Sequence, residues 1–221
     1  EIGDFFVCYC DRCRAARAAI PADAPDYYKD MALSTAPVAR TALSLAPDAW
    51  ISYATYTGFT PEMQQTPPSW VPLIPPDMLC QWTLTSMEGA RWPAGLRPPT
   101  RRNLGYLHWG NKSTHTVHQF YLDRIRGICH SAAQAGFEGL VTYGEDPAWL
   151  INMRLFYEAW SYFLEHPDRQ VADFTRDRLA QWFGSADEAR KATPLLLGLE
   201  RQGLTRQNLA ATLATIRQDA A

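Results

Sequence analysis

Three cysteines near the N-terminus are the most specific chemical signal in this sequence. Cys8, Cys10 and Cys13 fall within six residues, and neighbouring disulfides among thiols this close would be strained. As thiolates they would suit a soft metal ion, and tetrahedral Zn²⁺ is the usual occupant of such a set. The spacing therefore predicts a structural zinc-type site, with reduced cysteines that cap a loop as the alternative.

A structural zinc site needs a fourth ligand, which this run of cysteines does not contain. Cys80, Cys129 or a residue N-terminal to Glu1 could supply it. No cluster of histidines and carboxylates stands beside the cysteines, so a catalytic metal is not expected. A thiol or zinc redox protein is a further alternative, and it would require the three cysteines to be exposed and reactive.

Glu145 is the strongest candidate for a catalytic residue. It comes directly after the apolar run Gly139–Tyr143 and Gly144, at the C-terminal tip of a predicted strand, where βα-barrel enzymes place their catalytic groups. It also precedes a predicted helix N-terminus, whose partial positive charge favours an ionised carboxylate. Such a group could act as nucleophile, base or acceptor of hydrogen bonds from sugar hydroxyls, or it could form a capping pair with Asp146.

Aromatic residues gather at the ends of the predicted strands. The chain contains 8 Trp, 10 Tyr and 9 Phe, and flat apolar ligand faces are commonly stacked on such rings. The strand-end positions are Tyr56, Trp82, His108, Trp109 and Tyr143. Successive aromatics at strand ends predict a pocket with stacking walls, although a single ring there is usually part of a core. Asn152, in the helix after Glu145, could reach back to this pocket.

Composition excludes several classes of partner. Of the 221 residues, 47% are hydrophobic and 20% are charged, which is typical of a chain that folds around a core. The formal net charge of −2 argues against a nucleic acid or an anionic membrane held by bulk charge. No stretch approaches the 18 apolar residues that a membrane span would need, so none is predicted.

The elements that must position these residues alternate between strands and helices. Apolar runs predict strands at 5–7, 50–56, 78–83, 104–109 and 139–143. Helical periodicity and capping signals predict helices at about 26–45, 120–135, 146–165, 169–183 and 185–200, with a last one from about residue 205. Pro37 is expected to end or kink the first of them.

This alternation predicts an α/β fold with a mostly parallel sheet built of βα units. Long loops rich in Trp, Tyr and His follow the strands, which is typical of the C-terminal face of a (β/α)8 TIM barrel. A barrel needs eight strands, and only four or five are visible. We therefore expect residues 1–166 to form the C-terminal half of a barrel, about strands 4–8, and residues 167–221 to form a helical extension packed on it.

Two segments resemble known carbohydrate-active families. The run Cys8-Tyr9-Cys10-Asp11-Arg12-Cys13 resembles the cysteine cluster that follows the fourth strand in family 42 β-galactosidases, where it binds a structural zinc and an upstream cysteine completes the site. The stretch from Asn103 onward resembles uncharacterised barrel proteins related to α-glucuronidases and family 20-type hexosaminidases. That likeness rests on the Tyr143–Asn152 segment and on the helix that contains YEAWSYFLEHPD.

The resemblance implies a glycoside hydrolase-like barrel that cleaves O-glycosidic bonds of an oligo- or polysaccharide with paired carboxylates and no catalytic cofactor. The acid/base would lie at or before Glu1, and the remainder of the barrel N-terminal to residue 1. No clear Asn-Glu pair is visible, and a strand ends in His108-Trp109 where a carboxylate is expected. A non-catalytic carbohydrate-binding barrel, or a degenerate hydrolase, is therefore the alternative function.

Overall fold

The structure is a computed structural model of the 221-residue chain. It describes residues 7–22, 26–54, 65–84, 95–108, 122–143 and 151–202, together with 210, 211 and 214. The chain forms two compact units. The first unit consists of 1–85, 92–107 and 134–141, and the second unit consists of 86–91, 108–133 and 142–221. The division expected at residue 166 stays a prediction.

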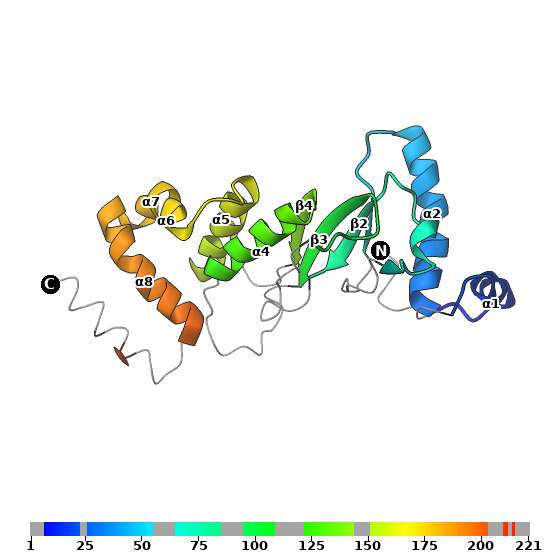
Figure 1. Cartoon of the computed structure of the whole chain (residues 1–221), viewed down its shortest axis with the longest axis horizontal. Coiled ribbons are helices and arrows are strands. Elements are labelled where there is room, and N and C mark those ends of the chain that lie inside the picture. Colours follow the sequence, from blue (N-terminus) through cyan, green and yellow to red (C-terminus); the bar gives the residue numbers. More distant parts are fainter. Residues whose placement is uncertain are drawn as a thin grey trace. The chain divides into compact units, whose positions relative to one another are not determined.

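Two helices and a parallel sheet make up the first unit (Figure 1). Its elements are α1 (Asp11–Ala18), α2 (Asp26–Leu45), β1 (Ser52–Ala54), the 3-10 turn η1 (Val71–Leu73), β2 (Leu79–Thr83), β3 (Arg102–His108) and β4 (Gly139–Tyr143). The strands lie in chain order, β1-β2-β3-β4, and the pairs β1–β2 and β2–β3 are parallel. The predicted α/β class with a parallel sheet is confirmed, and the barrel is not.

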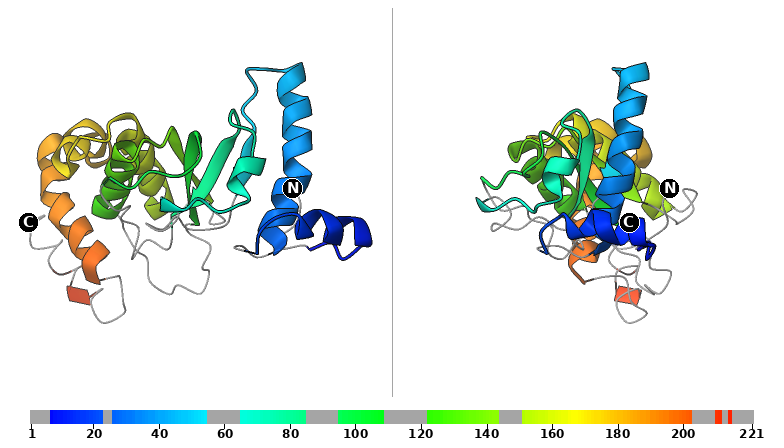
Figure 2. Two further views of the ribbon diagram at one scale, coloured as in Figure 1. Left: turned by 45° about the vertical axis from the view of Figure 1, so that its right-hand side comes forward. Right: turned by 90° about the vertical axis from the view of Figure 1, so that its right-hand side faces the viewer.

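Helix α2 continues through Pro37, so the predicted break or kink is wrong (Figure 2). Pro37 lacks an N–H group and faces solvent. On the other side of the helix, Ala32 and Ala39 are buried in the core of the first unit. Helical stability in proteins comes mostly from such a packed face, and here it outweighs the unfavourable propensity of one proline.

The core of the first unit is centred on Trp70. Its ring lies 5.9 Å from that of Tyr28 in α2, 6.0 Å from that of Tyr53 in β1 and 5.8 Å from that of Trp82 in β2. Tyr53 pairs in register with Cys80, and Trp82 with the buried Gly105 of β3. These residues alternate along the strands with more exposed ones, so one face of the sheet packs against α2 and η1.

Three polar side chains beside this core, those of Trp82, Thr100 and Asn103, are hydrogen-bonded to one another. The indole N–H of Trp82 donates to Thr100 Oγ1 and to Asn103 Oδ1, both at 3.0 Å. The amide of Asn103 donates to the carbonyl oxygen of Thr100 at 2.7 Å, and the Thr100 hydroxyl donates to Asn103 Oδ1. Satisfied groups of this kind avoid the cost of burial without a partner.

Helices make up the described part of the second unit, apart from the end of β4 (Figure 1). They are α4 (Leu122–Gln134), α5 (Ile151–Glu165), α6 (Val171–Phe174), the π-helical turn η2 (Thr175–Leu179), α7 (Ala180–Phe183) and α8 (Ala186–Gln202). None of the helices in the described ranges has the length and hydrophobicity to cross a bilayer.

Local signals placed several helix ends correctly. Gly136, which follows α4, and Gly184, which follows α7, both adopt positive φ, at 78° and 81°. The Ser185 hydroxyl accepts the backbone N–H of Glu188 at 3.2 Å, as expected for the N-cap of α8. The π-helical turn of η2 was not predicted, because no propensity rule for single residues distinguishes it from an α-helix.

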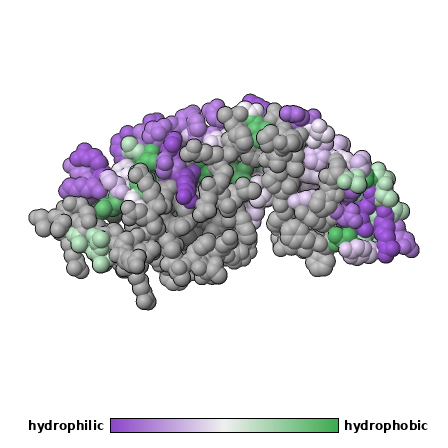
Figure 3. Space-filling model, turned by 60° about the horizontal axis from the view of Figure 1, so that its bottom comes forward, coloured by the Kyte–Doolittle hydropathy of each residue, from purple (hydrophilic) through white to green (hydrophobic). Residues whose placement is uncertain are grey.

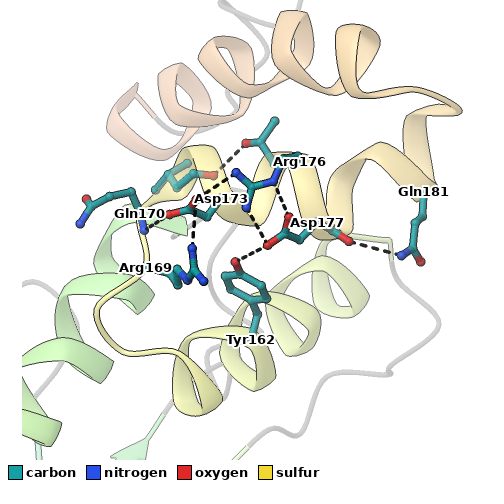
Figure 4. A network of polar contacts seen from close by, with 9 residues as sticks. Tyr162, Arg169, Gln170, Asp173, Arg176, Asp177 and Gln181 are labelled. Carbon is teal, nitrogen blue, oxygen red and sulfur yellow. Dashed lines mark hydrogen bonds and ion pairs between the residues drawn. The ribbon is translucent and has the colours of Figure 1, made fainter.

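An exposed polar network joins α5 to the α6–η2 segment (Figure 4). Arg176 contacts Asp177 at 2.6 Å and Asp173 at 3.1 Å. Tyr162 of α5 donates its hydroxyl to Asp177 at 2.8 Å, and Arg169 lies 3.7 Å from Asp173. The Arg176 guanidinium and the Tyr162 hydroxyl hold the pKa of Asp177 below its ordinary value.

Candidate metal centre

The three cysteines of the N-terminal run come together in the structure. Cys8, Cys10 and Cys13 are free thiols, and their sulfur atoms all lie within 4.8 Å of one another. The Cys8 thiol donates to the Cys10 sulfur at 3.4 Å. Two of the side chains are exposed and that of Cys13 is partly exposed. The predicted convergence of three metal-type ligands is therefore confirmed.

The start of α1 explains why this spacing brings the sulfur atoms together. Cys10 is the N-cap of α1, with extended backbone angles, and its sulfur accepts the backbone N–H of Cys13 at 3.5 Å. An N-cap side chain folds back over the first turn to satisfy N–H groups that have no helical partner. The cap therefore places the Cys10 sulfur against the residue three positions later, which is itself a cysteine.

Cys8 is fixed through its backbone by a buried ion pair. Its N–H donates to Asp30 Oδ2 of α2 at 2.9 Å, and its carbonyl oxygen accepts Nη1 of Arg17 at 2.7 Å. Arg17 and Asp30 contact each other at 2.6 Å, with side chains 7% and 13% exposed. Contacts behind the ligands of this kind orient metal sites in proteins. Arg17 and Asp30 thus position the first cysteine of the cluster.

Hydrogen bonds within the cluster separate the pKa values of two of its thiols. The Cys13 backbone N–H and the thiols of Cys8 and Cys13 lower the pKa of Cys10 to about 7. Hydrogen bonds to Cys10 and Cys8 raise the pKa of Cys13 to about 11. A helix N-terminus favours a thiolate in the same way. Cys10 therefore carries the first negative charge, and a bound cation would displace the protons that remain.

Within the described ranges, no further cysteine, histidine or carboxylate joins the three-sulfur group. Cys80 is completely buried in the core of the first unit, and Cys129 is buried on α4 in the second unit. Desolvation raises the pKa of both thiols, that of Cys129 to about 12. Cys80 is a packing residue of the first unit and does not join the three sulfur atoms, so the expectation that it completes the site is wrong. Cys129, in the second unit, and a ligand N-terminal to Glu1 stay predictions.

The predicted sugar-binding residues fall mostly outside the part of the chain that the structure describes. Tyr56, Trp109 and Glu145 lie outside the described residues. The backbone alone is described for three others: His108 ends β3, Tyr143 ends β4, and Asn152 lies in the first turn of α5. Their predicted roles stay predictions.

Trp82 is the one predicted sugar-binding residue whose side chain is described, and it lies in the core. Its side chain is 0% exposed and packs against Trp70. Its indole N–H is already engaged by Thr100 and Asn103. The ring offers no free face to a ligand, because the sheet register directs it toward the same side as Tyr53, against α2 and η1.

Two positioning residues and one buried cation were missed by the sequence analysis. Arg17 and Asp30 are separated by 13 positions, and Lys29 is buried on α2. The charge pattern alone carries no sign of their roles, since charged residues in helices are usually solvated. The available signal was the apolar periodicity of α2. It could have been used to find which charged residues fall on the buried side of the helix.

Comparisons with known proteins add no assignment to this geometry. The chain matches no protein-family model, no curated protein and no solved structure. The function must therefore be argued from the site itself.

Proposed function

We propose that Cys8, Cys10 and Cys13 bind one Zn²⁺ ion with a structural role. The observation that carries this proposal is the convergence of three sulfur atoms within 4.8 Å. A Zn–S bond of about 2.3 Å in tetrahedral geometry separates two sulfur ligands by about 3.8 Å. The Cys8–Cys10 sulfur distance of 3.4 Å is close to that value, so small side-chain rotations would complete the arrangement.

The role is structural because the ligands connect to the packing of two helices. Cys10 and Cys13 belong to the first turn of α1, and Cys8 is held by Asp30 of α2. A metal ion bound by all three sulfurs would fasten the loop before α1 to the α1–α2 contact. Binding to the folded chain then adds directly to its stability.

The test is metal analysis of the purified chain after expression with added zinc and removal of loose metal. We expect about one zinc per chain, a Co²⁺ form with thiolate-to-metal charge-transfer absorption, and a fall in the thermal midpoint with a chelator. Cys10→Ser should lose the metal, whereas Cys129→Ser, which changes a cysteine buried in α4, should retain it. Equal zinc content in both variants would contradict the proposal, and a metal-free chain with three rapidly modified thiols would favour the redox alternative.

We propose, as a second function, that the chain is part of a glycoside hydrolase-like (β/α)8 barrel. This is favoured by a separate observation, the order β1-β2-β3-β4 with parallel pairs. Consecutive strands of a barrel are neighbours in chain order, whereas a doubly wound sheet reverses its order. Parallel strands direct their C-terminal ends to one edge, and Glu145 follows β4 by two residues.

This second proposal is tested with the complete protein that carries this chain. We expect release of the chromophore from aryl glycosides, and loss of that activity in Glu145→Gln while a polysaccharide is still bound. Binding without hydrolysis would favour the non-catalytic carbohydrate-binding alternative. Absence of both binding and hydrolysis across a panel of glycosides would contradict a carbohydrate function.

A further inference from the structure

A pocket of about 650 Å³ lies between α1 and the start of α2, away from the three sulfur atoms. One part of its lining is apolar and the other is charged. The lining residues are Arg14, Arg17, Ala18, Ala19, Ile20, Pro21, Ala22, Asp26 and Lys29. Figure 3 shows hydrophilic and weakly hydrophobic residues side by side in the region of α1, at the right of the view. The volume is within the range of small-molecule sites and exceeds what a bare ion needs.

Lys29 is the unusual member of this lining. Its side chain lines the pocket, yet the residue is only 4% exposed. Lysines are almost never buried to this degree without a partner. Lys29 makes no hydrogen bond or ion pair within the described ranges, in contrast to the buried Arg17, which contacts Asp30 and Asp26. A cation held in this way is a ready partner for an anion that enters the pocket.

The charge balance of the pocket indicates the charge of its ligand. Arg17 is compensated by Asp30 at 2.6 Å and by Asp26 at 3.5 Å. The Arg14 side chain makes one hydrogen bond within the described ranges, from its Nε to the carbonyl oxygen of Tyr9 at 2.6 Å. The three cations Arg14, Arg17 and Lys29 exceed the two carboxylates by one positive charge, and no carboxylate within the described ranges contacts the terminal guanidinium nitrogens of Arg14 or the Lys29 ammonium. These groups remain available to an anion with several acceptor oxygen atoms.

We propose that this pocket binds a small organic phosphate, with the phosphate group on Arg14 and Lys29 and the organic part against Ala18, Ala19 and Ile20. A phosphate monoester carries close to two negative charges at neutral pH. The arginine fork and the compact lysine ammonium are the two cationic groups that recognise phosphate in proteins. A phosphate ester offers three strong acceptor oxygen atoms to the two cationic groups, whereas a carboxylate offers two.

This site is separate from the proposed metal centre, although the two share supporting residues. Arg14 and Arg17 also hold the carbonyl oxygens of Tyr9 and Cys8 in the cysteine loop. No cysteine lines the described pocket. The proposed phosphate contacts therefore include none of the metal ligands.

The experiment is isothermal titration of the chain with phenyl phosphate, inorganic phosphate and benzoate at pH 7.5, where ~2 negative charges reside on the ester. We expect phenyl phosphate to bind most tightly and benzoate most weakly. Lys29→Met, which keeps the apolar stem, and Arg14→Gln should each weaken phenyl phosphate binding by roughly tenfold or more. Lys191→Met, at an exposed position on α8, is the matched control and should bind as the unaltered chain does.

If Lys29→Met fails to fold, Arg14→Gln still tests the proposal, because Arg14 is exposed and its replacement should not disturb the core. Equal affinity for benzoate and phenyl phosphate would overturn the proposal. So would affinity for phenyl phosphate that is unchanged in Arg14→Gln, or an absence of binding by the folded, unaltered chain.

Discussion

The two units use the same ion-pair chemistry in two different environments. In the first unit, Arg17 and Asp30 meet at 2.6 Å with side chains 7% and 13% exposed. In the second unit, Arg176 and Asp177 meet at the same distance with side chains 58% and 37% exposed. Both arginines also contact a second carboxylate, Asp26 in one case and Asp173 in the other.

The difference in exposure decides what each pair can do. Water and salt screen the charges of an exposed pair, which then contributes little to stability. A buried pair is costly to form, but removal of one partner leaves a desolvated charge without compensation. Since the buried pair also binds both backbone groups of Cys8, it positions the metal ligands, whereas the network of Figure 4 is a surface feature of a helical unit.

The largest effect is expected for Arg17→Met, which leaves Asp30 buried without its cation. The urea midpoint of the first unit should fall by several times the change produced by any variant of the exposed network. Zinc affinity should fall by about 10- to 100-fold, as for the loss of an outer contact to a metal ligand. Urea denaturation and competitive zinc titration measure the two quantities, with Arg40→Met, at an exposed position on α2, as the control. A variant with unchanged zinc affinity would show that the pair does not position Cys8.

A matched pair of glycines compares backbone strain in the two units. Gly136 and Gly184 have φ of 78° and 81°, and alanine in this conformation costs roughly 1–2 kcal/mol. An added Cβ at Gly136 would lie 2.9 Å from Nη1 of Arg97, whereas that at Gly184 would meet nothing within 4 Å. Gly136→Ala should therefore destabilise the chain at least as much as Gly184→Ala. The free energy of unfolding in urea tests the order, and the reverse order would contradict it.

Tyr162→Phe tests the contribution of a buried hydroxyl group that donates to the exposed network. Tyr162 is buried, and its hydroxyl donates to Asp177 at 2.8 Å. Loss of this hydrogen bond should reduce the free energy of unfolding by about 1 kcal/mol. Tyr157→Phe, on the same helix, is the control. Unaltered stability in Tyr162→Phe would indicate that Asp177 finds an equally good partner in water.

The smallest effect is expected for Arg176→Gln. At physiological ionic strength the urea midpoint should be nearly unchanged, since the two ion pairs of Arg176 lie at the surface. A loss comparable to that of Arg17→Met would overturn the comparison between the two networks.

Acid titration is a second measurement of how much the Arg176–Asp177 contact contributes to stability. The pKa of Asp177 lies below its ordinary value of 3.8, mainly because of the hydrogen bond from Arg176. A carboxyl group with a lowered folded-state pKa stabilises the protein above its ordinary pKa and loses that contribution as the pH falls through the lowered value. The second unit should thus lose some stability below about pH 4, and Arg176→Gln should lose less over the same range. Equal acid sensitivity of the two chains would contradict this assignment.

Local signals predicted four strands of the sheet well. The strand at 139–143 has the predicted bounds, and the strands predicted at 50–56, 78–83 and 104–109 overlap β1, β2 and β3. The strand predicted at 5–7 lies mostly outside the described residues. Gly184 and Ser185 mark a helix end and a helix start through contacts within a few residues. The prediction at Pro37 was wrong because the pattern shows only the local cost of a proline within a helix. The stabilisation from packing Ala32 and Ala39 against the core depends on residues far away in the chain.

The sequence by itself determined the approach of Cys10 and Cys13. The three cysteines span six residues, and the geometry of one helix N-cap is enough to bring the last two together, whereas Cys8 is also held by Asp30 of α2. A site built from contacts this short in the chain can be read from spacing, because few conformations of the intervening backbone are possible.

Tertiary structure alone decided the surroundings of that cluster. Whether Trp82 faces a ligand or a core, whether Lys29 is solvated or buried, and whether Arg17 meets Asp30 all depend on how α2 packs. The roles of Trp82, Lys29 and Arg17 all follow from their burial, because burial removes a ring or a charge from contact with water. Burial is a property of contacts between residues far apart in the chain, and residue spacing does not contain it.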